Sequence, residues 1–401
     1  MRKIYLFTFM MLLLVHLKGQ AQQITLHVER AGTLHGMINA SRLPYITDLK
    51  LTGELNGTDI SFIRTLVKKN LRFLDLSEAR IVEGGAIYYS NYRTSNDIIG
   101  SYMFYNPDYS PISPCAISKI NLPNSVTGIE EGAFKSCTRL TDINIPNSVT
   151  SIGPETFKSC TSLTDINIPN SVTSIGERAF SGCTSLTDIN IPDAVKSIEP
   201  ETFSGCTRLT DINIPNSVTS IGYEAFYNCT RLTDINIPNS VTSIERSTFY
   251  SCTGLTSINI PGSVTTIGSN AFYDCTSLTD INIPNSVTSI GEQAFYNCDN
   301  LKSVYMNAST PPFIGSQAFH NISKDLTIYI PRGSYTAYWL SYWGNYNLVE
   351  YDPTDIQGVT TSAHNGVEKY FSIDGRPLPG PCKGVNIIQD TDGKTRKAWI
   401  P

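Results

Sequence analysis

The sequence predicts a repeat solenoid of 23-residue coils, each with one β-strand and with short turns or 3-10 pieces on the other side. Three observations support this fold class. Eight cysteines recur every 23 residues, the apolar letters keep the same phase, and the segments between them are nearly identical. The regular cysteines are Cys137, Cys160, Cys183, Cys206, Cys229, Cys252, Cys275 and Cys298.

One coil shows how the repeat should fold. Ile143 and Ile145 alternate with Asn144, so the isoleucines should face the core while Asn144 faces outward. Pro146 should end the strand because it has no N–H for the ladder. Gly153 is expected to supply a positive-φ bend before the coil closes. A single coil buries too little to fold alone, so the copies should share ladders and one core, in about twelve coils.

The first residues read as a targeting segment. A basic start, an apolar run over residues 4–17 and the small residues before Gln22 predict a signal peptide over 1–21, cleaved after Ala21. The alternative is an uncleaved anchor, although the run is shorter than the roughly 20 residues that span a bilayer. We see no later membrane span, so the mature chain should be secreted or held at the cell surface.

The remaining chain divides according to where the 23-residue period holds. Residues 22–116 should form an N-terminal cap, two longer coils and an insertion over 84–114 that is rich in Tyr, Ser, Asn and Pro. Long loops in compact arrays are functional or disordered. Residues 117–322 form the regular array, 323–352 a C-terminal cap, 353–365 a linker and 366–401 a small β tail. The cap aromatics expected to cover the core are Tyr338, Trp339, Tyr342, Trp343 and Tyr346.

The motif L-x-x-I-x-I-P-x-S-V-x-x-I-G-x-x-A-F-x-x-C resembles the BspA-type leucine-rich repeat of surface proteins from Bacteroides-like bacteria. The resemblance covers about residues 117–320, and segments 51–66, 71–82 and 326–339 resemble the flanks of that group. It implies a leucine-rich repeat solenoid, curved or straight, and a surface location. Some members of the family are implicated in adhesion to host proteins, which makes adhesion an expectation by analogy.

The β tail resembles the C-terminal segments of many exported Bacteroidetes proteins, some of which serve as type IX secretion and anchoring signals. Its Asp374-Gly375-Arg376 and Ile387-Ile388 fit that pattern, whereas the ending Trp399-Ile400-Pro401 departs from it. The tail is therefore either a sorting or anchoring segment or a plain terminal β module.

The cysteines allow two interpretations. Disulfides suit an exported protein, but residues stacked at one coil position point in parallel and stay about 4.8 Å apart, too far for the ~3.8 Å Cβ separation of a disulfide. A straight column also does not converge on a metal. We favour buried free thiols that fill the core. Cys115 and Cys382 lie outside the register.

Several functional classes lack support. The net charge of −5 gives no basic face for nucleic acid. The histidines of the mature chain are scattered, and no phosphate loop or nucleophile motif is present. A row of aspartates, one in most coils, could attract Ca²⁺ or basic ligands, although a solvated face is the simpler interpretation. We expect no catalytic residue, no enzyme activity, no cofactor and no metal.

We expect a macromolecular partner, namely a protein such as a host extracellular or matrix protein, bound by a monomer. The alternatives are a structural spacer and a carbohydrate-binding module. Tyrosine suits interfaces because it offers large area at low rotamer entropy. Candidate partner residues are Tyr88, Tyr89, Tyr92, Tyr102, Tyr105 and Tyr109 in the insertion and Tyr227, Tyr250, Tyr273 and Tyr296 in a row along the array.

Overall fold

The computed structural model describes residues 22–105 and 115–352, together with the backbone of five strands in the tail. The expected signal peptide, Tyr109 and Cys382 lie outside the described residues. The tail strands are β22 (Gln357–Gly358), β23 (Lys369–Ser372), β24 (Pro377–Leu378), β25 (Gly384–Gln389) and β26 (Thr395–Ile400), and they form one sheet in the order β22-β26-β25-β23-β24.

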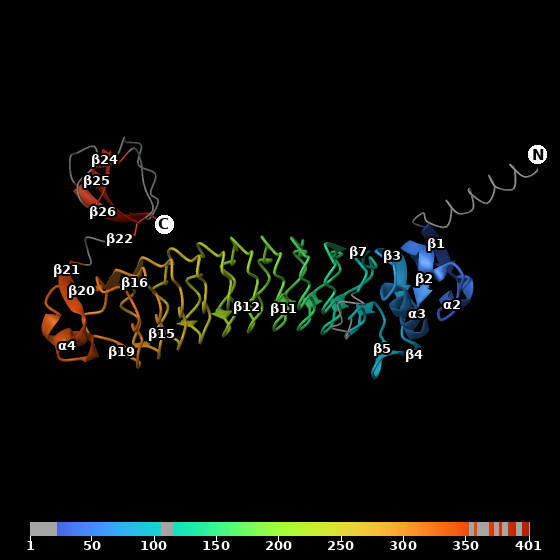
Figure 1. Cartoon of the computed structure of the whole chain (residues 1–401), viewed down its shortest axis with the longest axis horizontal. Coiled ribbons are helices and arrows are strands. Elements are labelled where there is room, and N and C mark those ends of the chain that lie inside the picture. The colour runs from blue at the N-terminus through green and yellow to red at the C-terminus, as the bar shows by residue number, and fades with distance from the viewer. Residues whose placement is uncertain are drawn as a thin grey trace, which may run out of the picture.

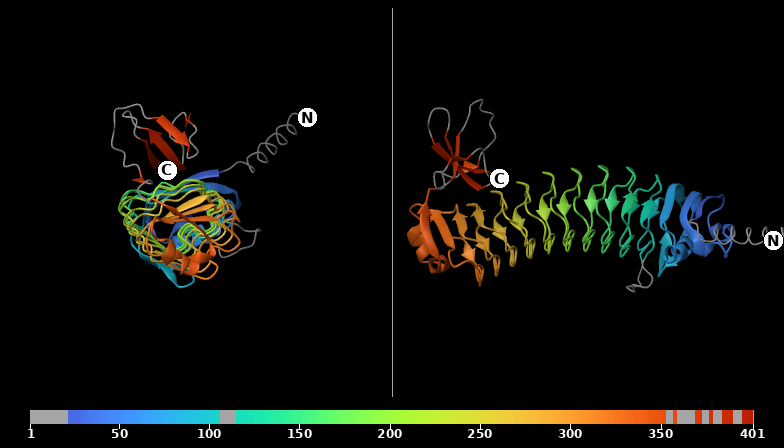
Figure 2. Two further views of the ribbon diagram at one scale, coloured as in Figure 1. Left: turned by 90° about the vertical axis from the view of Figure 1, so that its left-hand side faces the viewer. Right: turned by 45° about the horizontal axis from the view of Figure 1, so that its top comes forward.

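The chain winds into an elongated solenoid of about 13 turns whose coils stack along one axis (Figure 1). The end-on view shows the coils superimposed (Figure 2). The predicted fold class is confirmed. The stack is slightly longer than the twelve expected coils because β1 extends the sheet at one end and β21 at the other.

The main parallel ladder uses the predicted strand position. It is continuous near both ends, and in the middle it thins to single bridges between successive asparagines. The N-terminal strands are β1 (Gln22–Val28), β2 (Ile46–Leu55), β3 (Phe73–Ile81), β7 (Lys119–Asn121) and β9 (Asp142–Asn144), and the C-terminal strands are β16 (Asp280–Ile283), β18 (Ser303–Met306), β20 (Thr327–Pro331) and β21 (Asn347–Tyr351).

Each coil of the array also contributes a second, two-residue strand that the pattern did not anticipate. These strands pair in parallel with the equivalent residues of the neighbouring coil, as Ser151 does with Ser174. They are β6 (Ile98–Ile99), β8 (Gly128–Ile129), β10 (Ser151–Ile152), β11 (Ser174–Ile175), β12 (Ser197–Ile198), β13 (Ser220–Ile221), β14 (Ser243–Ile244), β15 (Thr266–Ile267), β17 (Ser289–Ile290) and β19 (Phe313–Ile314).

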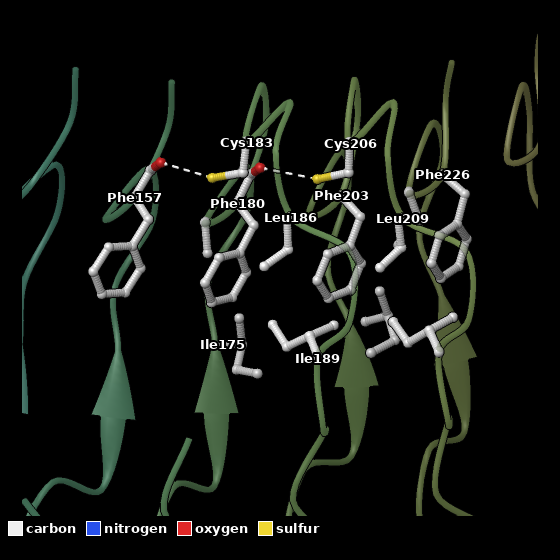
Figure 3. Close-up of a cluster of buried hydrophobic side chains, with 14 of the residues drawn as sticks. Phe157, Ile175, Phe180, Cys183, Leu186, Ile189, Phe203, Cys206, Leu209 and Phe226 are labelled. Carbon is white, nitrogen blue, oxygen red and sulfur yellow. Dashed lines mark hydrogen bonds between the residues drawn. The ribbon is translucent and has the colours of Figure 1, made fainter. Parts of the chain in front are cut away.

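The core follows the predicted alternation. Ile143 and Ile145 are buried while Asn144 is exposed. A column of phenylalanine rings runs from Phe104 to Phe319, with centroids 4.9–5.7 Å apart and nearly parallel planes (Figure 3). Rings at one coil position can stack because the coil rise of about 4.8 Å falls within the ~4.5–7 Å centroid separation of an aromatic pair.

The regular cysteines form a second buried column. Each thiol donates to the phenylalanine carbonyl of the preceding coil, as Cys183 does to Phe157 at 3.1 Å and Cys206 to Phe180 at 3.3 Å (Figure 3). The described cysteines are free and buried. This bond explains why a small residue with a donor recurs there. Cys115, placed outside the register by its spacing, in fact lies at the start of the column, hydrogen-bonded to Cys137.

The expected role of Gly153 was wrong. Its φ is not positive, and the left-handed residues of the coil are Glu155 (φ 52°) and Ser159 (φ 61°). A Cβ on Gly153 would lie 2.8 Å from the backbone of Glu130 in the preceding coil, so glycine serves close approach between coils. In three other coils this position holds a glutamate, namely Glu130, Glu199 or Glu245. The carboxylates of Glu199 and Glu245 each accept from the serine two residues earlier.

The N-terminal end carries most of the helix. It contains α2 (Leu34–Met37), η1 (Leu43–Tyr45) and α3 (Gly57–Val67), and α3 begins with a capping box between Asn56 and Asp59. The hairpin of β4 (Gly84–Tyr89) and β5 (Tyr92–Thr94) projects from the side of the stack (Figure 1).

The expected insertion over 84–114 is divided in the structure. Residues 84–94 form the hairpin, but β6 pairs with β8, and Phe104 stacks on Phe134 at 5.2 Å. Residues 97–105 therefore belong to the stack, with Ile99, Met103 and Phe104 buried. The Tyr-rich composition hid these three apolar residues, which supply the first rung of the second ladder and of the phenylalanine column.

The C-terminal cap comprises α4 (Tyr335–Trp339) and η2 (Tyr342–Asn345). Tyr338 and Trp343 are fully buried and cover the last core ring, with Trp343 5.6 Å from Phe319. Trp339 and Tyr342 were expected to join them, but they are 56% and 77% exposed, because the short helices turn these side chains away from the core. Among the described residues, no helix has the length and apolarity needed to cross a membrane.

Candidate functional site

The hairpin and the adjoining coil bring four of the predicted tyrosines into one cluster. Tyr89 and Tyr92 come from the hairpin, whereas Tyr102 and Tyr105 come from the first rung of the array. Tyr102 lies 5.4 Å from both Tyr92 and Tyr105, and Tyr89 lies 5.7 Å from Tyr105, measured between ring centroids. All four rings are partly exposed. We call this group the tyrosine cluster.

Arg64 organises the tyrosine cluster from beneath. Its guanidinium donates to the carbonyls of Tyr102 and Met103 at 2.7 Å and of Tyr105 at 3.2 Å, and it lies 4.6 Å from the centroid of the Tyr89 ring. Burial lowers the pKa of Arg64. A buried cation satisfied by three carbonyls and a ring face fixes the hairpin against the first rung.

Sequence reasoning missed Arg64, although a signal was present. It follows Ile60 by four residues and precedes Val67 by three, so on a helix it shares their buried face. A cation on an apolar helical face needs internal partners. The pattern could have predicted a buried arginine there, but not which carbonyls it binds.

Two predicted residues of the insertion do not present a surface. Tyr88 is 5% exposed, and its hydroxyl donates to the carbonyl of Ser101 at 2.8 Å. Burial raises its pKa. Tyr88 therefore supports the hairpin from inside, and Tyr109 lies outside the described residues. Beside the cluster, a pocket of about 450 Å³ opens between α3 and β4, lined by Arg64, Tyr88 and Tyr89 among others.

Charged groups border the tyrosine cluster. The hydroxyl of Tyr102 donates to the Glu131 carboxylate, and the Lys135 ammonium lies 5.9 and 5.7 Å from the rings of Tyr102 and Tyr105. Lys135 also pairs with Glu155. Burial opposes ionisation of Glu155, but hydrogen bonds from two lysines outweigh it, so its pKa is lowered. The cluster is thus an amphipathic surface with fixed charges at its rim.

The second set of predicted residues forms a regular row. Centroid distances are 4.7 Å from Tyr227 to Tyr250, 4.5 Å from Tyr250 to Tyr273 and 4.9 Å from Tyr273 to Tyr296, with planes within 10° of parallel. His320 continues the row at 5.3 Å. We call these residues the tyrosine row. Each inner ring has both faces covered by its neighbours, so the inner rings offer only their edges and hydroxyls.

The strand face with its aspartates shows no metal arrangement. In the part of the chain that the structure describes, no group of three or more His, Cys, Asp or Glu side chains is placed to hold a metal ion. Asp142 is paired with Lys119 at 2.6 Å. Burial raises the pKa of Asp280, the last member of the row.

The geometry defines a class of protein: a repeat scaffold with the same core in each coil, the tyrosine cluster near one end and a cap at the other. The family described as BspA type leucine rich repeat region (6 copies) matches residues 97–233 and 196–327. Together these ranges cover 97–327, more than half of the 401 residues. The chain belongs to the BspA-type leucine-rich repeat family.

Two of the solved structures similar to this chain are bacterial leucine-rich repeat proteins. A leucine-rich cell surface protein from Faecalibacterium prausnitzii is 28% identical, covering 67% of this chain and 86% of that one, with a TM-score of 0.38. A leucine-rich repeat protein from Bacteroides ovatus is 23% identical, covering 70% and 92%, with a TM-score of 0.31. None of the curated proteins compared with the chain matches it.

Proposed function

We propose that this protein is an exported, non-enzymatic surface scaffold that binds a protein partner through the tyrosine cluster. One observation carries the proposal. Four partly exposed tyrosines from two segments meet in one cluster that is fixed by the buried Arg64. Most of the array repeats one surface, whereas this cluster occurs once in the residues that the structure describes. Unique aromatic residues on a rigid scaffold favour specific recognition.

The chemistry of the cluster suits a protein ligand such as an extracellular matrix protein. Rigid rings supply contact area at little entropic cost. The Glu131 and Lys135 charges at the rim can pair with complementary side chains and orient the partner. Leucine-rich repeat proteins serve protein binding generally, which agrees with this assignment.

Binding of the full mature chain to a panel of purified extracellular matrix proteins tests the proposal. Tyr92→Ala and Tyr105→Ala should reduce retention at least tenfold with little change in Tm. The matched control is Tyr335→Ala, which removes an exposed tyrosine from the C-terminal cap. Retention that is equal in all variants would move the site elsewhere, and retention of no protein at all would favour a spacer.

Export and surface attachment form a separate part of the proposal. Residues 1–21 would act as a cleaved signal peptide, and the tail over 366–401 would serve sorting or anchoring. The N-terminal mass of the mature protein should correspond to a start at Gln22, and protease added to intact cells should remove the array. A chain that keeps residues 1–21 would contradict cleavage, and protection from external protease would contradict surface exposure.

A further inference from the structure

A second concave site lies at the opposite end of the molecule, between β19 and η2. Its volume is about 440 Å³, within the ~300–1,000 Å³ range of small-molecule sites. The lining residues are Phe313, Ile314, Gly315, Ser316, Gln317, Tyr342, Asn345 and Tyr346. We call this hollow the cap pocket. It involves none of the residues of the tyrosine cluster.

Two rings of the cap pocket are unusually exposed. Phe313 is 70% exposed and Tyr342 is 77% exposed. Within residues 22–105 and 115–352, neither ring stacks on another aromatic side chain, in contrast to Tyr250, whose faces are covered by Tyr227 and Tyr273. The faces of Phe313 and Tyr342 are therefore available to a ligand.

The pocket walls are tied together by Trp343. The indole N–H donates to the carbonyl of Pro312 at 2.9 Å, which fixes the residue before Phe313. Trp343 itself follows Tyr342, is fully buried, and contacts Tyr346 with ring centroids 6.1 Å apart. One buried anchor thus sets the spacing of both walls, and exposed rings on fixed backbone are pre-organised for binding.

The polar groups of the cap pocket are neutral. Gln317 uses its side-chain carbonyl to accept from Gln293, and Asn345 uses its amide nitrogen to donate to the Tyr342 carbonyl. These bonds leave the amide nitrogen of Gln317 and the side-chain carbonyl of Asn345 for a ligand. No lining residue carries a charge. The neighbouring Glu292 carboxylate lies outside the lining and accepts from the Ser316 hydroxyl at 2.8 Å. A phosphate or carboxylate ligand would therefore find no counter-charge among the lining residues.

We propose that the cap pocket binds a neutral carbohydrate. A sugar ring presents C–H groups on its faces and hydroxyls around its edge. The C–H groups match the negative faces of Phe313 and Tyr342. The hydroxyls match the amides of Gln317 and Asn345. An extended peptide would instead seek backbone partners along a sheet edge, so the combination of free ring faces and neutral amides favours a sugar.

Native affinity electrophoresis of the full chain tests the proposal, with a starch-type α-glucan, a β-glucan and a galactomannan as neutral polysaccharides and heparin as a charged one. At least one neutral polysaccharide should retard the protein. Phe313→Ala and Tyr342→Ala should each weaken retardation about three- to tenfold. Tyr342→Phe should keep it, because the ring face remains.

Leu340→Ala is the matched control, since Leu340 is a 79% exposed apolar residue of the same cap outside the pocket. It should leave both retardation and Tm unchanged. The proposal is overturned if no neutral polysaccharide retards the protein, if heparin alone does so, or if the alanine variants at positions 313 and 342 behave like wild type. Equal Tm values for all variants keep a folding defect from mimicking lost binding.

Discussion

Two aromatic columns run side by side along the array, and they differ in exposure and in extent. Phe226 and Tyr227 are neighbours in one coil. The Phe226 ring lies 5.6 Å from Phe249 in the next coil, and the Tyr227 ring lies 4.7 Å from Tyr250, measured between centroids. The phenylalanine column is buried from Phe104 to Phe319, whereas the tyrosine row begins only at Tyr227. The coil period brings both sets of rings into stacks. Burial requires phenylalanine at every position of the inner column, whereas the more exposed position of the tyrosine row accepts other residue types.

The largest expected effect is a loss of stability at alkaline pH, which tests the buried cysteine column. Burial raises the pKa of Cys183 to about 12, and it raises the pKa of Cys160 and Cys206 well above the ordinary value. An unfolded thiol ionises near pH 8.5. Folded thiols stay neutral, so their stabilising contribution is complete below pH 8.5 and is lost as the pH rises toward 12, by about 1.4 kcal/mol per thiol per pH unit.

Thermal unfolding between pH 8 and 10 should therefore show a steep fall in Tm, before most tyrosines ionise. Cys206→Ala should make the fall less steep by the share of one thiol. A Tm that does not change over this interval would contradict the free, buried thiols. Low thiol labelling in the native protein and full labelling in denaturant without reductant provide an independent check.

The next largest effect is the loss of stability when one ring of the phenylalanine column is removed, for comparison with its neighbour in the tyrosine row. Phe249 is fully buried between Phe226 and Phe272. Phe249→Ala should lower the free energy of unfolding by about 3–5 kcal/mol, because it opens a cavity in the column. Chemical denaturation measures this. A loss below about 1 kcal/mol would mean that the coils collapse around the gap and that the column is not close-packed.

Arg64→Gln should have an intermediate and local effect. It removes a charged donor from three carbonyls, which costs about 2–3 kcal/mol. Hydrogen exchange should accelerate in residues 84–105 and stay unchanged over 140–300. Arg246→Gln, whose side chain is 57% exposed, is the matched control and should change neither region. Uniform acceleration along the chain would show that Arg64 supports the whole stack instead.

Tyr250→Ala should give the smallest change, about 0.5–1.5 kcal/mol, because the ring is only half-buried and loses two stacking contacts. Tyr250→Phe should change stability by less, since the stack remains. Urea denaturation beside Phe249→Ala completes the comparison. A cost for Tyr250→Ala that equals that of Phe249→Ala would make the tyrosine row structural and would end its interpretation as a free surface.

Much of the fold could be predicted because the repeat is local. The alternation of Ile143 and Ile145 with Asn144 gave the strand and its polarity, and the 23-residue period gave the stack. The division of residues 84–114 could not be predicted. Ile99 and Phe104 occupy repeat positions, but the segment holds too few of the other repeat residues to reveal the 23-residue period. For the tyrosine cluster, the sequence showed only that the segment is rich in tyrosine. It did not show the role of Arg64, because Arg64 contacts residues 38–41 positions away in the chain.

The sequence by itself determined which side chains enter the core, because an apolar residue repeated at the coil period has one face on which every copy can be buried. Only the tertiary structure decided what the surface offers. It placed left-handed backbone at Glu155 and Ser159, although neither residue type favours that conformation. It covered the faces of the tyrosine row and left those of Phe313 and Tyr342 open. The reason is that ring orientation and backbone conformation depend on neighbouring coils and caps, which contribute contacts that no single repeat contains.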